Sequence, residues 1–402
     1  MKYISLLFCC AIIWGCSKTE KSKNEKITEV ETIDITKGFF DDSTAYLSDF
    51  TDSIQYIPLE SKGEKSLLSD IDQIFFCDTN IFISDRDQKV ILRFNKNGKF
   101  LNRIGKIGKG PGEYAKNEYI GLNREKKNIL VWDNPQTRFI TYSFNGDFIK
   151  QEKINEYLIF NIYPKGNLIY TLRCFPVMIQ HNNYPINIYN NQLKLQKSLI
   201  NRSYESENLT KCEARNKYLY RSLGFYNYKD SLSYWDYNYD TIYRITYEEA
   251  IPRYVITQKD DLPHNVNYST QPIGKYNFYL DFFETEKYFF FSKSFSTEGD
   301  VESTILYNKD SKECFNLRFD YKSINSGFIN DIDGGWPFKP EFYTDTDAIG
   351  CYFFPYELKK LLKTEQFKNI KVKYPQKRRE LIEMIEESNI RQNPILMLVK
   401  LN

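Results

Sequence analysis

Apolar and polar residues alternate in short stretches along most of the chain, a pattern that is typical of β-strands separated by turns. Two of these regions repeat each other: residues 83–104 (ISDRDQKVILRFNKNGKFLNRI) align without a gap with residues 131–152 (VWDNPQTRFITYSFNGDFIKQE). In both regions an apolar strand ends in an aspartate, Asp85 or Asp133, and a polar turn leads into a second strand of β-branched and aromatic residues. The pattern predicts a repeated unit of antiparallel strands.

The second and third strands of each unit are joined by an Asn-Gly pair, which is Asn97-Gly98 in the first unit and Asn145-Gly146 in the second. Asn-Gly between two strands is a strong hairpin signal, because both residues accept the positive φ that a type I′ turn demands. We therefore predict a type I′ hairpin at both places.

Weaker copies of the strand, turn and strand pattern follow at 186–196, 241–256 and 304–317. Units of about 45–60 residues with many short strands are typical of a β-propeller. The sequence allows six to eight blades, and we favour an all-β fold of six blades, each a four-stranded antiparallel sheet. A short C-terminal helical segment is expected at 376–388. We expect the final strand, 395–401, to pair with an early one such as 53–60 and close the ring.

The glycine-rich stretch GKIGKGPGEY at 105–114 requires a choice between a phosphate-binding loop and a structural connection. Its spacing matches neither the P-loop nor the dinucleotide fingerprint, and no apolar-periodic helix follows it. We interpret it as the link from the outer strand of one blade to the inner strand of the next, with glycines supplying unusual φ values.

The N-terminus has the layout of a secretory signal, with Lys2 and then an apolar run that is too short to span a bilayer. Ile13-Trp14-Gly15-Cys16 resembles the lipobox of bacterial lipoproteins, although Trp14 departs from the small residue usual at its position. We expect a lipoprotein signal peptide at 1–15, a lipidated Cys16 with a flexible tether at 16–45, and the propeller at 46–402. The protein would then be an outer membrane lipoprotein. The alternative is an ordinary signal with a chance Gly-Cys.

The composition supports a large folded core and excludes some partners. Of 402 residues, 41% are apolar, and the formal net charge is +2, which argues against nucleic acid as a partner. No CxxC spacing supports a zinc ribbon or a redox pair. Cys77 and Cys351 lie among aromatic residues and are expected to act as small hydrophobic side chains. Outside the signal and Cys16, the cysteines are Cys77, Cys174, Cys212, Cys314 and Cys351.

Three segments together give a family resemblance. Residues 82–114, DTIYRI at 240–245 and NPILMLVKL at 393–401 resemble the six-bladed β-propeller lipoproteins of gut-type Gram-negative bacteria, relatives of the NHL-repeat propellers. The resemblance implies a fold and a location but no reaction.

Residues that would carry catalysis or hold a metal are few. NHL-like lyases hold zinc with several histidines, whereas this chain has only His181 and His264. Asp331 and Asp333, like Asp345 and Asp347, resemble fragments of calcium loops but lack the further oxygen ligands. We therefore expect no metal and no cofactor.

The segment YNYKDSLSYWDYNYD, 226–240, is the strongest indication of binding. Its aromatic rings would suit stacking on sugars or apolar side chains at a propeller mouth. Tyr234, Trp235 and Tyr237 are the candidate ligand-binding residues here, together with Trp336 in a loop-like stretch further on. The alternation is also what any half-buried strand shows.

These observations favour a lipid-anchored envelope protein, without enzymatic activity, that binds a glycan, a peptide or a protein partner. The alternative is a hydrolase or lyase whose carboxylates come from different blades and meet in the propeller channel. A third hypothesis is a scaffold within an envelope complex.

Overall fold

The structure is a computed structural model. It describes residues 30–40, 44–156, 159–173, 185–200, 223–229, 231–236, 239–258, 279–293, 301–320, 323–324, 326–345 and 348–402.

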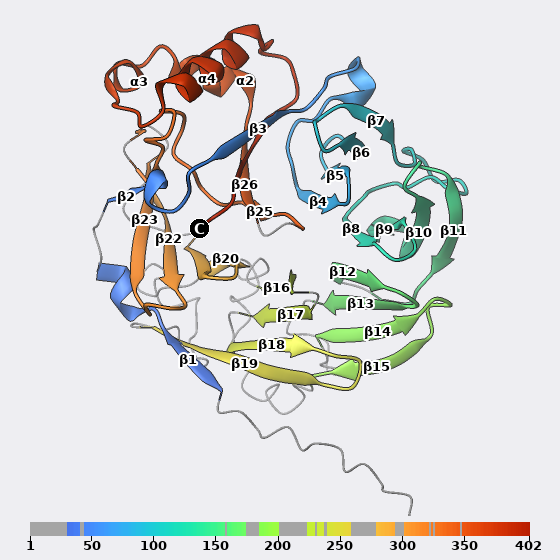
Figure 1. Cartoon of the computed structure of the whole chain (residues 1–402). Coiled ribbons are helices and arrows are strands. Elements are labelled where there is room, and N and C mark those ends of the chain that lie inside the picture. The colour runs from blue at the N-terminus through green and yellow to red at the C-terminus, as the bar shows by residue number, and fades with distance from the viewer. Residues whose placement is uncertain are drawn as a thin grey trace, which may run out of the picture.

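Six antiparallel sheets surround one axis as the blades of a β-propeller, which confirms the predicted fold (Figure 1). The first strand of each blade lies nearest the axis and the last at the periphery. Blades 1 to 3 are β4 (Gln73–Cys77), β5 (Asn80–Asp85), β6 (Val90–Asn95) and β7 (Phe100–Arg103); β8 (Tyr119–Asn123), β9 (Asn128–Asp133), β10 (Arg138–Ser143) and β11 (Phe148–Lys153); and β12 (Ile159–Lys165), β13 (Leu168–Arg173), β14 (Ile186–Asn190) and β15 (Leu195–Leu199).

The remaining blades follow the same order of strands. Blades 4 to 6 are β16 (Leu223–Tyr228), β17 (Ser231–Asp236), β18 (Tyr239–Ile245) and β19 (Ala250–Thr257); β20 (Tyr279–Glu284), β21 (Tyr288–Lys293), β22 (Val301–Asn308) and β23 (Cys314–Asp320); and β25 (Phe342–Tyr343), β26 (Ile349–Phe353), β27 (Ile395–Val399) and β3 (Ile54–Pro58). A short parallel pair, β2 (Ala45–Tyr46) and β24 (Phe328–Ile329), joins the N-terminal part to the segment before blade 6.

Blade 6 closes the ring with strands from both ends of the chain. The C-terminal strand β27 pairs antiparallel with β3, with Leu396 opposite Ile57. The predicted pairing of 395–401 with 53–60 is confirmed. Closure gives the C-terminal strand a partner on both sides, β26 and β3.

The predicted duplication corresponds to blades 1 and 2, but the geometry of its hairpins differs from the expectation. Only the glycine of each Asn-Gly pair has positive φ, +82° at Gly98 and +89° at Gly146. The Gly98 N–H donates to the Asn95 carbonyl at 2.9 Å, and the pairing register shifts within both hairpins. These are type I turns followed by a glycine bulge, so the type I′ prediction was wrong.

The glycine-rich stretch links β7 to β8, as predicted. Gly105 has φ +64°, and a Cβ there would lie 2.7 Å from the Tyr142 ring. The Tyr142 hydroxyl donates to the Gly112 carbonyl at 3.2 Å, which holds the link against blade 2. The segment connects blades through backbone turns and close packing.

Three helices lie between β26 and β27 and form a group on one side of the ring (Figure 1). The predicted helical segment is present as α4 (Pro375–Glu387), while the sequence did not predict α2 (Pro355–Leu361) and α3 (Glu365–Asn369). No helix in the described ranges is long and apolar enough to cross a membrane.

An N-terminal strap, residues 31–40, covers the edge of blade 4. It consists of β1 (Glu31–Asp34), which pairs parallel with β19, and the 3-10 helix η1 (Thr36–Phe40). Ile33 and Ile35 are fully buried in a cluster with side chains of blades 4 and 5. The folded part therefore includes residues that the sequence assigned to the tether at 16–45.

Candidate functional site

Several charged side chains near the propeller axis lie at the end where the innermost strands begin. Because strands alternate in direction, the innermost strands of all blades begin at the same end, which we call the rim end; the opposite end is the far end. Acidic residues precede three innermost strands: Asp72 before β4, Glu118 before β8 and Glu156 before β12. Asp72 and Glu118 directly precede their strands and Glu156 lies three positions before its strand, so three neighbouring blades each place a carboxylate at the rim end.

Blades 1 and 2 are joined at the rim end by a chain of ion pairs. The Arg86 guanidinium lies 2.5 Å from the Asp72 carboxylate and 3.9 Å from that of Glu118. Glu118 also pairs with Lys116 at 2.6 Å. Burial alone would lower the pKa of Arg86, but the hydrogen bond and the charge of Asp72 raise the pKa above its usual value. Arg86 remains a cation held between two carboxylates.

The turn that carries Arg86 is held by the buried carboxylate of Asp85, the last residue of β5. Its Oδ2 accepts hydrogen bonds from the Ser69 N–H at 2.6 Å and the Asp70 N–H at 3.1 Å, while its Oδ1 accepts one from the Gln88 N–H at 2.8 Å. These bonds fasten the segment before β4 to the turn after β5. The positions of Asp70 and Arg86 therefore depend on one buried aspartate.

Blade 3 contributes a second group at the rim end. The Glu156 carboxylate forms an ion pair with the Arg173 guanidinium, with Nε 3.0 Å from Oε2, and accepts hydrogen bonds from the Tyr189 hydroxyl at 2.5 Å and from the Asn187 side-chain amide at 3.2 Å. Burial, followed by the hydrogen bond to Glu156, raises the pKa of Tyr189, so the phenol stays protonated and donates. The Glu156 carboxylate is fixed by one ion pair and two hydrogen bonds.

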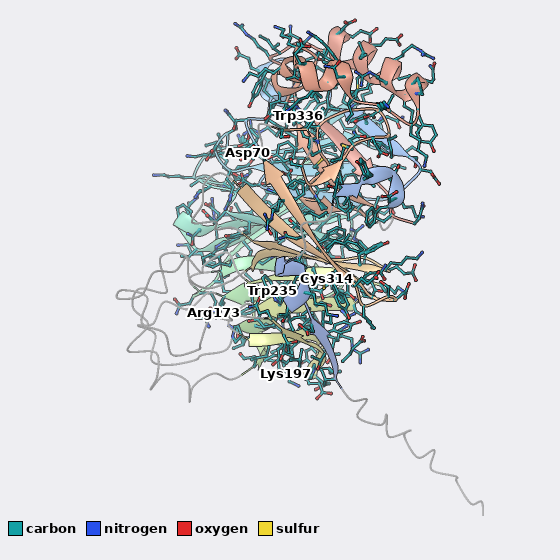
Figure 2. The ribbon with its side chains drawn as sticks, turned by 90° about the vertical axis from the view of Figure 1, so that its left-hand side faces the viewer. Asp70, Arg173, Lys197, Trp235, Cys314 and Trp336 are labelled. Atoms are coloured by element: carbon teal, nitrogen blue, oxygen red, sulfur yellow. The ribbon has the colours of Figure 1, made fainter. Side chains whose placement is uncertain are left out.

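One ring contact and one tyrosine hydrogen bond connect these groups into one arc. The Tyr119 and Phe160 rings, from β8 and β12, have centroids 6.0 Å apart, and Tyr352 of β26 donates its hydroxyl to Asp70 at 2.5 Å. Figure 2 shows Asp70 and Arg173 toward the same side of the propeller. We define the rim arc as these side chains of blades 6, 1, 2 and 3: Asp70, Asp72, Arg86, Lys116, Glu118, Tyr119, Glu156, Phe160, Arg173 and Tyr352.

The side chains of the rim arc are held in place by their partners and are partly exposed to solvent. The side chains of Arg86 and Lys116 are 32% and 40% exposed, and those of Asp72 and Glu118 are 14% and 18% exposed. The carboxylates are already engaged by cations or hydroxyls, which fixes their direction. The arc holds four carboxylates and three cations, so it presents donors and acceptors with nearly balanced charge. Such a surface suits recognition of a polar, weakly charged partner.

A second charged cluster lies between blades 4 and 5 and is more deeply buried. The Glu284 carboxylate has no exposed area and accepts from the Tyr226 hydroxyl at 2.9 Å, from two Arg253 nitrogens at 2.9 Å and from Lys309 at 2.8 Å. Burial lowers the pKa of Lys309 despite the attraction of Glu284. Because the donors converge on one buried carboxylate, removing one of them would leave buried charge without its partner, and the cluster links blade 4 to blade 5.

Comparison with known proteins places the chain in a family. The model of the family described as "Domain of unknown function (DUF4934)" matches residues 30–400. The chain belongs to this family. Comparison with curated protein sequences gives no match.

Two solved structures share the fold of this DUF4934 chain. A Bacteroides fragilis NCTC 9343 protein that is inferred to be exported superimposes with a TM-score of 0.68 at 16% identity, covering 93% of this chain and 100% of its own. A member of the DUF4221 family from Bacteroides vulgatus ATCC 8482 gives a TM-score of 0.53 at 11% identity, covering 88% of this chain and 97% of its own. At these identities the likeness establishes the propeller fold alone.

The aromatic residues predicted to bind a ligand lie apart from the rim arc. Tyr234 is fully buried and Trp235 is 5% exposed, in clusters on opposite faces of β17. Neither ring offers a free face for stacking, because neighbouring blades cover both sides of the strand. Trp336 is half-buried against the helices, and its Nε1–H donates to the Glu357 carbonyl at 3.4 Å. Tyr237 lies outside the described residues.

Other predicted positions are located as follows. Asp331 accepts from the backbone and hydroxyl of Ser48, and Asp333 accepts from Asn330, Gly335 and Tyr56. Both carboxylates are therefore used by protein donors. In the described part of the chain, no three His, Cys, Asp or Glu side chains form a group that could hold a metal ion.

The cysteines agree with their predicted role where the structure describes them. Cys77 and Cys351 are buried and unbridged within apolar clusters. Lipidation at Cys16 and the roles of His181 and His264 concern positions outside the described residues.

The rim arc was not predicted from the sequence. Its common signal is a carboxylate just before an innermost strand, and this signal becomes visible only when the first strand of every blade is known.

Proposed function

We propose that this protein is an exported, lipid-anchored interaction module that binds a glycan, a peptide or a protein segment across the rim arc. The rim arc is the observation that carries the proposal, since it spans four blades with oriented, partly exposed donors and acceptors. The propeller fold is consistent with an interaction module, and a solved propeller of the same fold is inferred to be exported. The lipobox at Cys16 supports the anchor.

The near balance of charge restricts the class of partner. A polyanion would meet four carboxylates and a polycation would meet three basic side chains at the same surface. Sugar hydroxyls and peptide groups can use both kinds of side chain, and the rings of Tyr119 and Phe160 provide aromatic surface beside them. The partner we propose is a neutral glycan or a peptide of mixed charge.

Glycan and peptide arrays probed with the chain from Ser17 onward test this proposal. Arg86→Ala removes the cation that joins two carboxylates, and we expect it to weaken binding of an array hit about 10-fold or more. Lys197→Ala is a matched control, because Lys197 has the same 32% exposure and an ion pair with Glu248 at 2.7 Å, away from the rim arc (Figure 2).

Equal loss in the two variants would contradict binding at the rim arc, as would the absence of any hit. Turnover of an array component that Glu118→Gln abolishes would instead support the carboxylate-dependent hydrolase or lyase. Thermal unfolding of each variant separates lost binding from lost folding.

A further inference from the structure

The direction in which the chain leaves the propeller relates the rim arc to the membrane. β1 runs parallel to β19, the outermost strand of blade 4, with Glu31 opposite Tyr254 and Asp34 opposite Thr257. An outermost strand runs from the far end toward the rim end, because it is the fourth in an antiparallel blade. The chain therefore enters the strap at the far end of the propeller.

A contact with blade 5 locates this point independently. Lys312 donates to the Glu31 carboxylate at 2.5 Å. Lys312 lies in the turn between β22 and β23, the third and fourth strands of blade 5, and such turns lie at the far end. The first described residues are thus fixed on the opposite side of the propeller from the rim arc.

The far end also exposes large apolar side chains in three consecutive blades. Phe148 and Leu195 open the outermost strands of blades 2 and 3 and are 45% and 51% exposed, and Tyr247, 40% exposed, lies in the corresponding turn of blade 4. Lys150, Lys194 and Lys197 are near these side chains in the sequence, and Lys150 and Lys197 form ion pairs with Glu152 and Glu248. Exposed apolar side chains flanked by lysines are found on protein surfaces that touch the membrane interface.

We propose that the far end faces the membrane to which the protein is anchored, and that the rim arc faces away from it. This inference rests on the lipid anchor of the proposed function and adds an orientation to it. Residues 31–35 are attached to the propeller by strand pairing and by the buried side chains of Ile33 and Ile35. The lipid anchor is therefore connected to the propeller at a fixed point at the far end. The partner then reaches the rim arc from the aqueous phase and not from the lipid of the same leaflet.

Fluorescence quenching on the complete lipidated protein tests the orientation. A fluorescent unnatural amino acid is placed either at Ser311, in the far-end turn beside Lys312, or at Asp87, in the exposed turn after β5 at the rim end. The protein is reconstituted in phosphatidylcholine vesicles that carry a nitroxide on the headgroup. We expect quenching at Ser311 to exceed quenching at Asp87 at least about threefold, because nitroxide quenching requires close approach to the bilayer surface.

Equal quenching at the two positions, or stronger quenching at Asp87, would overturn the orientation while leaving the anchor intact. Cys16→Ser protein provides the reference without acylation. If the native chain behaves like Cys16→Ser and its mass shows no acyl groups, the anchor and the orientation both fail. Binding at the rim arc is decided separately by the arrays.

Discussion

At the scale of single residues, a buried carboxylate at the end of a strand organises the turns of the first two blades. Asp85 and Asp133 occupy corresponding positions and are both fully buried. Asp85 binds backbone N–H groups, whereas Asp133 accepts from the Lys116 N–H and from the side chains of Gln136 and Arg138. In blades 1 and 2, the repeated aspartate therefore binds the backbone of the segment that precedes the innermost strand.

Replacing Asp85 should destabilise the fold and disturb the rim arc together. In Asp85→Asn, an amide group replaces one oxygen that accepts N–H bonds, so buried donors lose their acceptor. We expect the free energy of unfolding to fall by about 2–4 kcal/mol. Urea unfolding of Asp85→Asn and of Asp87→Asn, which changes an exposed aspartate of the same turn, measures this effect. Similar stability of the two variants would show that the buried hydrogen bonds are not needed.

Single residues also show why the rim arc was not predicted from the sequence. Tyr234 and Trp235 look amphipathic in the sequence, since polar residues surround them. In a propeller, adjacent blades cover both faces of a strand, so two successive aromatic rings can both be buried. Period-two alternation therefore does not separate inside from outside here. Arg86 and Glu118 belong to no sequence motif. Their place in the rim arc follows only from the side chains that lie next to them in the folded protein.

At the scale of elements, strands and their order were predictable, while long-range packing of short segments was not. The duplication defined the strands of blades 1 and 2, and the apolar C-terminal stretch suggested ring closure. The N-terminal strap is different, because its few apolar residues, Ile33, Ile35, Phe39 and Phe40, do not repeat the strand and turn pattern of the blades. Its partner strand β19 lies more than 200 residues further along the chain, and nothing local specifies that pairing.

The strap should behave as part of the cooperative fold. Ile33→Ala leaves a cavity in the cluster between blades 4 and 5, so we expect the free energy of unfolding to fall by about 2–4 kcal/mol. Thr32→Ala is the matched control, since Thr32 is exposed on the same strand and should change stability by no more than about 0.5 kcal/mol. Chemical unfolding followed by circular dichroism gives both values. An Ile33→Ala protein as stable as Thr32→Ala would assign the strap to the tether.

At the scale of the whole molecule, buried phenols make stability depend on alkaline pH. Burial raises the pKa of Tyr56, Tyr226 and Tyr343 above the ordinary value of 10.0. In the unfolded chain these phenols lose their protons near pH 10, whereas in the folded protein they keep them. Their contribution to stability is complete below the unfolded pKa and is lost as the pH rises beyond it.

We expect the free energy of unfolding to be insensitive to these groups up to about pH 9 and then to fall by roughly 1 kcal/mol per pH unit for each phenol. Urea unfolding at about pH 8 and about pH 11 measures the change, and near-ultraviolet phenolate absorbance reports when the tyrosines ionise. Tyr226→Phe removes one titrating group and the hydrogen bond to Glu284, so it should be less stable at neutral pH yet lose less stability on going to alkaline pH. Ionisation of every tyrosine while the circular dichroism remains native would contradict the burial of these phenols, and for Tyr226 and Tyr343 it would also contradict the contacts that they make with other blades.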